Sequence, residues 1–290
     1  MVNKSENQKS NPAVLQWTGE RMVPDQNSYG SIEHLHRYSF LSKFLTEKMV
    51  VLDVACGEGY GTYMLSKQVN RVIGVDISIE AIEHAKKIYS NNNIHFINAN
   101  ATSIPLEDSL FDVIVSFETL EHLEEHEKLI KEFKRLLKND GLLIISTPDK
   151  RFFSKNNPNP FHVKELNFFE FKSLLNKFFP SSQFLFQKTI HGSIIFNNEA
   201  PNLLEQYSGD FENISRNTQV TEPEFIIGFA SPDESFALTI LNSFFDATAV
   251  HNEELINNRN IETKYFNIIT SRKFRLFNSI LRKLGYEFDV

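Results

Sequence analysis

The stretch from Val50 to Gly61 constrains the fold of this chain more than any other part of its 290 residues. It begins with a run of apolar residues and ends with glycines at the alternate positions 57, 59 and 61. This pattern is typical of a buried strand that runs into a tight turn and then a helix. Because glycine has no side chain, a ligand can lie against the backbone of the turn, and the first N–H groups of the helix lack partners within it. We therefore expect a nucleotide-like ligand at the end of this strand.

Two details indicate the kind of ligand. A dinucleotide-binding turn has the pattern G-x-G-x-x-G, and Thr62 stands where its third glycine would be. The carboxylate of Asp53, four residues before Gly57, would repel a pyrophosphate but attract a ligand with an ammonium and a sulfonium charge at the mouth of the site. Asp76 closes the segment VIGVDI, where an acid can accept both hydroxyls of a ribose. These features favour S-adenosylmethionine (SAM).

The pattern Asp53-x-x-x-Gly57-x-Gly59 with Asp76 continues into FDVIVSFETLEHL and LLKNDGLLIISTP. Together these motifs resemble the class I SAM-dependent methyltransferases, over roughly residues 18 to 180. The resemblance implies a set of cofactor-binding residues in the glycine turn, at the end of the second strand and after the third strand. These residues are Asp53, Ala55, Gly57, Gly59, Asp76, Ile77, Asn100, Ala101 and Thr102.

Asn100 departs from the family pattern, in which an aspartate commonly accepts a hydrogen bond from the adenine amino group. An asparagine can still accept such a bond through its side-chain carbonyl. We therefore expect the same contact at Asn100.

Apolar segments alternate with amphipathic ones between residues 50 and 147. We expect strands at 50–55, 72–77, 95–100, 111–117 and 141–147, and helices at 61–69, 78–90 and 124–138. This alternation predicts an α/β protein with a doubly wound parallel sheet and with ligands at the carboxyl ends of its strands. A helix at 164–179 and antiparallel sixth and seventh strands at 184–196 and 224–230 would complete the class I methyltransferase fold. We expect a frayed segment at 1–17, the methyltransferase domain at 18–232 and a helical C-terminal extension at 233–290.

Composition excludes several other classes of protein. The single cysteine, Cys56, allows no intrachain disulfide and is typical of a reducing compartment. No stretch reaches the ~18 apolar residues of a membrane span, and the polar start does not resemble a signal peptide, so we expect a cytoplasmic protein. A net charge of −7 with a pI near 5.8 argues against a broad nucleic-acid-binding surface, which would need a basic face.

The segment before the first core strand changes from a loop into an amphipathic helix at 32–45. Its TGER…EHLHRY motif resembles a branch of these enzymes associated with bacterial cell-surface glycans, in which such a segment can cover the cofactor as a lid. A cluster of functional side chains lies here, namely Glu20, Arg21, His34, His36, Arg37 and Tyr38. On one interpretation Arg37 or Tyr38 lies near the methionine carboxylate of SAM. On the other, Arg37 and the histidines merely face solvent.

The segment after the fourth strand contains E-x-x-E-H, formed by Glu118, Glu121 and His122. On a helical turn, residues three and four apart share a face, so these side chains can meet. They could bind Mg²⁺ or Mn²⁺, with the histidine shifting the preference toward Mn²⁺, Fe²⁺ or Zn²⁺. The spacing resembles metal-binding motifs of ubiquinone-pathway and small-RNA methyltransferases, and His162 stands where the latter have a further histidine. The alternative is a metal-free site in which His122 acts as a base. In both cases we expect all four side chains to converge beside the SAM methyl group.

The C-terminal segment combines an apolar stripe with basic residues. Phe274, Phe277, Ile280, Leu281 and Leu284 recur at helical spacing, and five arginines and lysines lie between positions 272 and 283. Such a helix could dock on the inner face of an anionic membrane or on a partner protein. It could equally pack on its own domain or on the second subunit of a homodimer.

The expected reaction is methyl transfer to oxygen, because an alkyl hydroxyl needs a base or a Lewis acid and this site offers histidines. Our first hypothesis is an O-methyltransferase for a sugar hydroxyl, in a nucleotide sugar or a surface polysaccharide. The second is a methyltransferase for a quinone-like metabolite or natural product, with an acceptor pocket built from the many phenylalanines between residues 152 and 196. A third is RNA 2′-O-methylation, and the alternative from a different class is a catalytically silent SAM-fold module.

Overall fold

A computed structural model describes residues 29–153, 159–190, 206–209, 214–217, 222–238, 242–243 and 245. The chain divides into two compact units, one comprising Met1–Pro24 with Tyr29–Phe244 and the other Asp25–Ser28 with Phe245–Val290. All described residues except Phe245 belong to the first unit. The expected frayed N-terminus, the segment with Glu20 and Arg21, and the expected basic C-terminal helix lie outside the described residues, so those expectations remain predictions.

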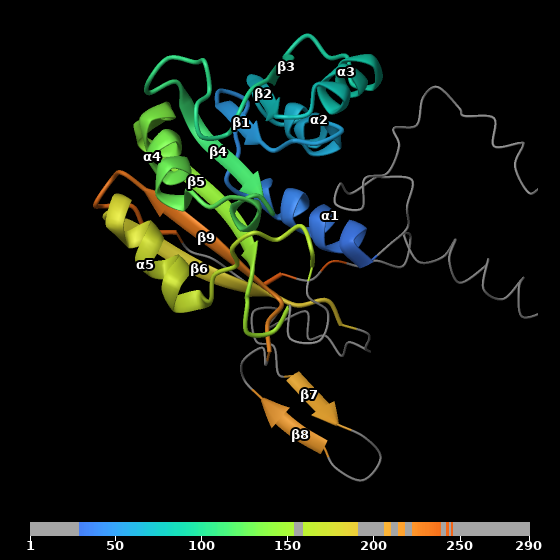
Figure 1. Ribbon diagram of the computed structural model, residues 1–290, viewed down its shortest axis with the longest axis vertical. Coiled ribbons are helices and arrows are strands. Elements are labelled where there is room, and N and C mark those ends of the chain that lie inside the picture. Colours follow the sequence, from blue (N-terminus) through green and yellow to red (C-terminus); the bar gives the residue numbers. More distant parts are fainter. Residues whose placement is uncertain are drawn as a thin grey trace, which may run out of the picture. The chain divides into compact units, whose positions relative to one another are not determined.

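The first unit is built on a seven-stranded sheet with the order β3-β2-β1-β4-β5-β9-β6 (Figure 1). Its strands are β1 (Val50–Val54), β2 (Arg71–Asp76), β3 (Ile94–Asn98), β4 (Phe111–Phe117), β5 (Leu137–Pro148), β6 (Ser181–Gln187) and β9 (Phe225–Ser231). The helices around it are α1 (Tyr29–Leu41), α2 (Tyr60–Ser66), α3 (Ile79–Ile88), α4 (His126–Leu136) and α5 (Phe168–Phe178), with a 3₁₀ helix, η1, at Leu120–His122. The first five strands are parallel, and β9 is antiparallel to its neighbours. This arrangement is the predicted class I methyltransferase fold.

The sixth strand differs from the prediction in its direction and its bounds. β9 pairs antiparallel with both β5 and β6, so β6 runs parallel to the first five strands. The prediction of an antiparallel sixth strand was therefore wrong. The crossover through α5 brings β6 into the sheet parallel to β5, whereas β9 lies between these two strands and runs in the opposite direction. In the chain between β6 and β9, β7 (Gln206–Gly209) and β8 (Ile214–Asn217) pair antiparallel as a separate two-stranded sheet.

Apolar side chains fill the space on both faces of the sheet. On one face, Leu52 of β1 belongs to a buried cluster with Phe133 of α4 and Phe171 of α5. On the other face, Val51 belongs to a cluster with Leu41 of α1. Figure 1 shows α4 and α5 along one side of the central strands. Because successive residues of a strand point to opposite faces, β1 is buried on both sides, in agreement with the buried strand predicted from its largely apolar sequence. Within the described part of the chain, the helices are too short or too polar to cross a membrane.

Candidate active site

The expected functional residues gather at the carboxyl edge of the sheet, around the point where the strand order reverses between β1 and β4. Two turns at this edge have strained backbones. Ala55 follows β1 with φ 59° and Glu118 follows β4 with φ 52°, although neither is a glycine. Positive φ values cost free energy in such residues and are concentrated at functional sites. In open α/β sheets, ligands bind at this kind of switch point.

Asp76 connects the glycine turn to the end of β2. Its Oδ2 accepts a hydrogen bond from the Gly57 N–H and its Oδ1 one from the Ser78 N–H, each at 2.8 Å. The neighbouring Ile77 is an apolar side chain that is 72% exposed. Asn98 reinforces this edge by donating to the main-chain carbonyls of Asp76 and Ile77. A carboxylate and an exposed apolar surface therefore lie beside the turn.

Asp53 lies deeper than the sequence predicted. It is 1% exposed, and its two carboxylate oxygens accept hydrogen bonds from the hydroxyls of Tyr38 at 3.1 Å and Thr62 at 2.6 Å. Burial raises the pKa of the Asp53 carboxyl to about 7. The expectation of a carboxylate at the mouth of the site was wrong, because the hydroxyls of Tyr38 and Thr62 enclose it in the protein interior.

Two of the three glycines serve the packing of the protein more than ligand access. A Cβ at Gly59, where φ is 86°, would lie 2.8 Å from the side chains of Ala85 and Phe96, and one at Gly61 would lie 2.1 Å from the ring of Tyr38. These positions need glycine because protein atoms already fill the space. The N–H of Gly57 donates to Asp76, so the main chain of this glycine lies beside an expected cofactor contact.

The segment after β3 is folded on itself. Oδ1 of Asn100 accepts from both the N–H and the hydroxyl of Thr102, each at 2.9 Å. Thr102 is buried and Ala101 half-buried. The side-chain carbonyl that we expect to contact adenine is thus already the acceptor of a local turn, and an adenine amino group would have to share it.

Helix α1 brings a buried cation to the same edge. Arg37 is 2% exposed, which excludes the interpretation that it faces solvent. Its Nε donates to Gln187 at 2.6 Å, its Nη1 lies 3.0 Å from Oε1 of Glu118, and its guanidinium lies 4.4 Å from the ring centre of Phe225. Nη2 makes no hydrogen bond within the described part of the chain. A buried donor without a partner is costly, so this position suits an anionic or carbonyl group of a ligand.

The histidines of α1 are also in contact with protein groups. Nδ1 of His34 lies 2.7 Å from the hydroxyl of Tyr60, and burial lowers the pKa of His34 to about 3. His36 lies 2.7 Å from the hydroxyl of Ser243. Neither histidine contributes to the group described next.

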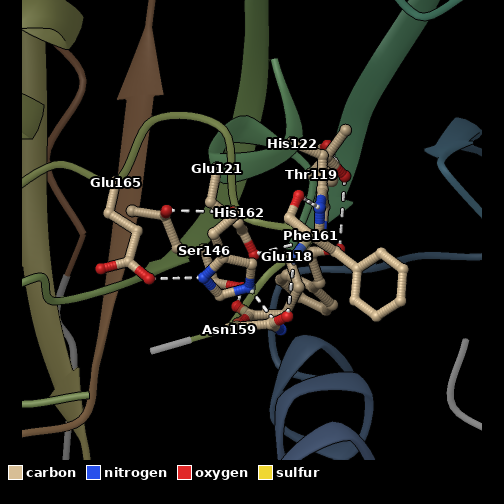
Figure 2. A network of polar contacts seen from close by, with 12 residues as sticks. Glu118, Thr119, Glu121, His122, Ser146, Asn159, Phe161, His162 and Glu165 are labelled. Carbon is tan, nitrogen blue, oxygen red and sulfur yellow. Dashed lines mark hydrogen bonds and ion pairs between the residues drawn. The ribbon is translucent and has the colours of Figure 1, made fainter. Parts of the chain in front are cut away.

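Three of the four predicted side chains after β4 and β5 converge (Figure 2). Ligand atoms of Glu121, His122 and His162 all lie within 4.8 Å of one another. The rings of the two histidines are 5.1 Å apart, and Nε2 of His122 is 3.9 Å from Oε1 of Glu121. Glu118 does not join this group, because its Oε1 is held by Arg37 and by the Ser146 hydroxyl at 2.6 Å. The part of Glu118 in the expected four-residue cluster stays a prediction.

Each member of the group has a partner that the sequence did not reveal. Glu121 is 1% exposed and accepts from the Thr147 hydroxyl at 3.1 Å. Burial, and then the nearby charge of Glu118, raise the pKa of the Glu121 carboxyl well above its usual range. His122 contacts a carbonyl of the following loop, and His162 lies between Asn159 and Glu165. Thr147 could have been found from its place at the end of β5, but the loop residues carry no sequence signal of their own.

Comparison with known proteins shows which proteins this chain is similar to. Residues 52–145 match the model of a methyltransferase domain family. A protein of Mycobacterium tuberculosis named "Probable S-adenosylmethionine-dependent methyltransferase" is 38% identical over 171 residues, which are 57% of this chain and 61% of that protein. The ubiquinone/menaquinone biosynthesis C-methyltransferase of Campylobacter jejuni is 28% identical over 118 residues, which are 38% of this chain and 49% of that protein. A solved SAM-dependent methyltransferase from Archaeoglobus fulgidus has the same fold, with a TM-score of 0.51 at 18% identity over 68% of this chain and 93% of that one.

The sheet order is that of the class I methyltransferase fold, residues 52–145 match a methyltransferase domain family, and the mycobacterial relative is named as dependent on SAM. The chain spans 61% of the length of the mycobacterial relative and 49% of the quinone-pathway relative. None of the three names refers to a cell-surface glycan. The acceptor is therefore a matter for proposal.

Proposed function

We propose that this protein is a SAM-dependent O-methyltransferase that acts on a sugar hydroxyl, in a nucleotide sugar or in a surface polysaccharide. The observation that carries the proposal is the pair of His122 and His162 beside Glu121, at the carboxyl ends of β4 and β5. SAM supplies an electrophilic methyl group. The protein has to hold the cofactor, exclude water, align the acceptor and take its proton.

For the cofactor, the carboxyl edge offers groups that match each part of SAM. Asp76 would accept the ribose hydroxyls, and the exposed side chain of Ile77 would lie against the adenine. Arg37 would bind the methionine carboxylate through Nη2, the buried donor that has no hydrogen bond within the described residues. Arg37 and Ser146 both contact Oε1 of Glu118, so Oε2 could accept from the methionine ammonium.

For the acceptor, His122 is the residue that would take the proton. An alkyl hydroxyl ionises far above neutral pH, so a base must act in the transition state. His122 is 32% exposed, whereas His162 and Glu121 are almost fully buried. His122 is therefore the member of the group that an acceptor can reach.

The alternative is a divalent cation held by Glu121, His122 and His162. With Glu118 held by Arg37 and Ser146, the donor set has two imidazoles and one carboxylate. This set favours Mn²⁺, Fe²⁺ or Zn²⁺ over Mg²⁺, which prefers oxygen ligands. Such a cation would polarise the acceptor hydroxyl in place of a base.

One experiment separates these readings. The purified full chain is incubated with radiolabelled SAM and a panel of nucleotide sugars and short oligosaccharides, with and without a chelator. Under the proposal, a sugar is methylated, chelation has no effect, and His122→Ala lowers turnover by roughly 10²–10⁴-fold. His95→Ala, an exposed histidine on β3, serves as the matched control. Loss of transfer on chelation, with SAM binding intact and activity restored by Mn²⁺ more than by Mg²⁺, would establish the metal instead.

A quinone-like acceptor is the second candidate. The relative from Campylobacter jejuni is a quinone-pathway enzyme, and aromatic side chains lie around the histidine pair. Phe153 stacks on His162 at 5.7 Å, and Phe161 is 48% exposed. A demethylated quinone is therefore included in the panel, and its methylation with all sugars inert would refute the sugar proposal. Failure to bind SAM in calorimetry would instead identify a silent module.

A further inference from the structure

The side-chain amide of Asn159 is oriented by the main chain. The N–H of Phe161 donates to Oδ1 of Asn159 at 3.0 Å, which identifies that end of the amide as the oxygen. The amino end, Nδ2, lies 3.1 Å from Nε2 of His162. An amide NH₂ group can only donate, so Nε2 of His162 must be the acceptor and carry a lone pair.

The opposite side of the same ring faces a carboxylate. Nδ1 of His162 lies 2.5 Å from Oε1 of Glu165, and the two side chains are 7% and 9% exposed. A carboxylate accepts, so Nδ1 carries the proton. A second proton on Nε2 would oppose the amino group of Asn159, and two donors would then face each other at 3.1 Å. His162 is thus set as the neutral ring with its proton on Nδ1.

The same loop orients His122. The Phe161 carbonyl oxygen lies 3.1 Å from Nδ1 of His122, and a carbonyl can only accept. His122 therefore also carries a proton on Nδ1, and its Nε2 faces Glu121 (Figure 2). The N–H groups of Val163 and Lys164 donate to the Glu121 carbonyl at 2.8 and 3.0 Å, which fastens the loop to η1.

We infer that Asn159 and Glu165 are positioning residues that fix His162 in the Nδ1–H form and, through residues 159–165, hold His122 in the same form. In the neutral form of His122, the lone pair is then on Nε2, where it could take the acceptor proton, with the ring of His162 beside it. The catalytic meaning of the inference rests on the proposed function, whereas the proton positions do not. A cation bound through Nε2 of His162 would first have to displace the amino group of Asn159.

The proton positions can be measured directly. Long-range ¹H–¹⁵N correlation spectra of imidazole rings distinguish the two neutral forms and the doubly protonated form. The full chain, labelled with ¹⁵N and without added SAM, is measured at pH 7.5, and His122 and His162 are assigned from the signals lost in His122→Gln and His162→Gln. We expect the Nδ1–H pattern for both. An Nε2–H or doubly protonated pattern at His162 in the wild-type protein would overturn the inference.

Variants test whether these two residues set the pattern. Glu165→Gln keeps an acceptor oxygen and should leave His162 unchanged. The double variant Asn159→Asp with Glu165→Ala leaves an acceptor only at position 159, beside Nε2 of His162. The His162 ring should therefore switch to the Nε2–H form. Lys164→Ala, an exposed neighbour in the same loop, is the control and should change neither ring. If His162 keeps the Nδ1–H form in the folded double variant, the positioning role of Asn159 and Glu165 is refuted. If the double variant fails to fold, the pattern of the wild-type protein decides.

The two proposals fail separately. Loss of the Nδ1–H pattern would refute the positioning role and leave sugar methylation untouched. An inert acceptor panel would refute the proposed function and leave the measured proton positions as they are.

Discussion

The hydroxyl of Tyr38 donates a hydrogen bond to Oδ1 of Asp53 at 3.1 Å, and this contact ties helix α1 to the strand that begins the sheet. Thr62 holds the other carboxylate oxygen at 2.6 Å. The acidic residue that marks the family pattern is therefore enclosed by hydroxyls before any ligand arrives. Because burial raises its pKa to about 7, Asp53 changes charge close to neutral pH.

We expect the affinity for SAM to rise with pH through this value. Below it Asp53 is mainly neutral, and above it the carboxylate attracts the cationic ligand. If only the ionised form binds, affinity should increase by up to roughly tenfold between pH values one unit below and one unit above the pKa. Calorimetry on the wild-type protein and on Asp53→Asn provides the measurement. The variant should lose this pH dependence, and an equal dependence in both proteins would assign the effect to another group.

Asp76→Ala should weaken SAM binding by ~1.5–3 kcal/mol, because charge-assisted bonds to the ribose would be lost. Asp76 also supports the turn through the Gly57 N–H, so a control must lose a similar structural bond. Asp112 provides it, since its carboxylate accepts from the Val50 N–H at 2.7 Å at the opposite end of β1. Asp112→Ala should leave the SAM dissociation constant unchanged. Equal losses in the two variants would remove Asp76 from the cofactor site.

Glu33 should make the stability of the fold depend on pH. It accepts from the Thr189 hydroxyl at 2.7 Å, and burial raises its pKa from 4.5 to about 7. Between pH 4.5 and about 7, the Glu33 carboxyl is ionised in the unfolded chain but keeps its proton in the folded protein. The contribution of Glu33 to stability is therefore complete below its unfolded pKa and is lost as pH rises through its folded pKa.

Glu33→Gln removes this dependence and should raise the melting temperature relative to wild type at pH 8 more than at pH 5. We expect the gain in melting temperature at pH 8 to exceed the gain at pH 5 by roughly 2–4 °C. This difference corresponds to about 1 kcal/mol in a domain of this size. Glu47→Gln, on an exposed residue, should show no such difference. A gain of equal size at both pH values would contradict the assignment.

Gly61→Ala tests the contact between α1 and α2. Alanine normally stabilises a helix relative to glycine by ~0.5–1 kcal/mol. Here its Cβ would lie 2.1 Å from the ring of Tyr38, and overpacking of this kind costs about 1–3 kcal/mol. We expect urea unfolding to show a net loss of stability in the single variant. Combining it with Tyr38→Ala should recover part of that loss, and additive effects would argue against the clash.

The sequence predicted the fold well where local signals and family pattern agree. The apolar run ending at Val54 and the glycine at position 59 locate β1 and the start of α2 closely. The direction of β6 was not predictable in the same way. It depends on pairing with β9, which lies about 40 residues further along the chain and has no local signal in the sequence of β6.

The candidate site was predicted in its members but not in its geometry. The E-x-x-E-H spacing was interpreted as one helical turn, on which Glu118 would meet Glu121 and His122. The positive φ of Glu118 breaks that geometry, and η1 begins only at Leu120. Glu118 consequently turns toward Arg37, a residue 81 positions earlier that no spacing rule connects with it.

The insertion of β9 between β5 and β6 has a consequence for how a ribosome-bound chain can fold. β9 is the last strand of this sheet to be synthesised, yet it occupies an interior place and supplies hydrogen-bond partners to two earlier strands. Until residue 231 has emerged, β5 keeps one unpaired edge and β6 has no partner in the sheet. A nascent chain that stops short of Phe225 therefore presents exposed apolar edges to its neighbours, and only the arrival of one late segment closes them.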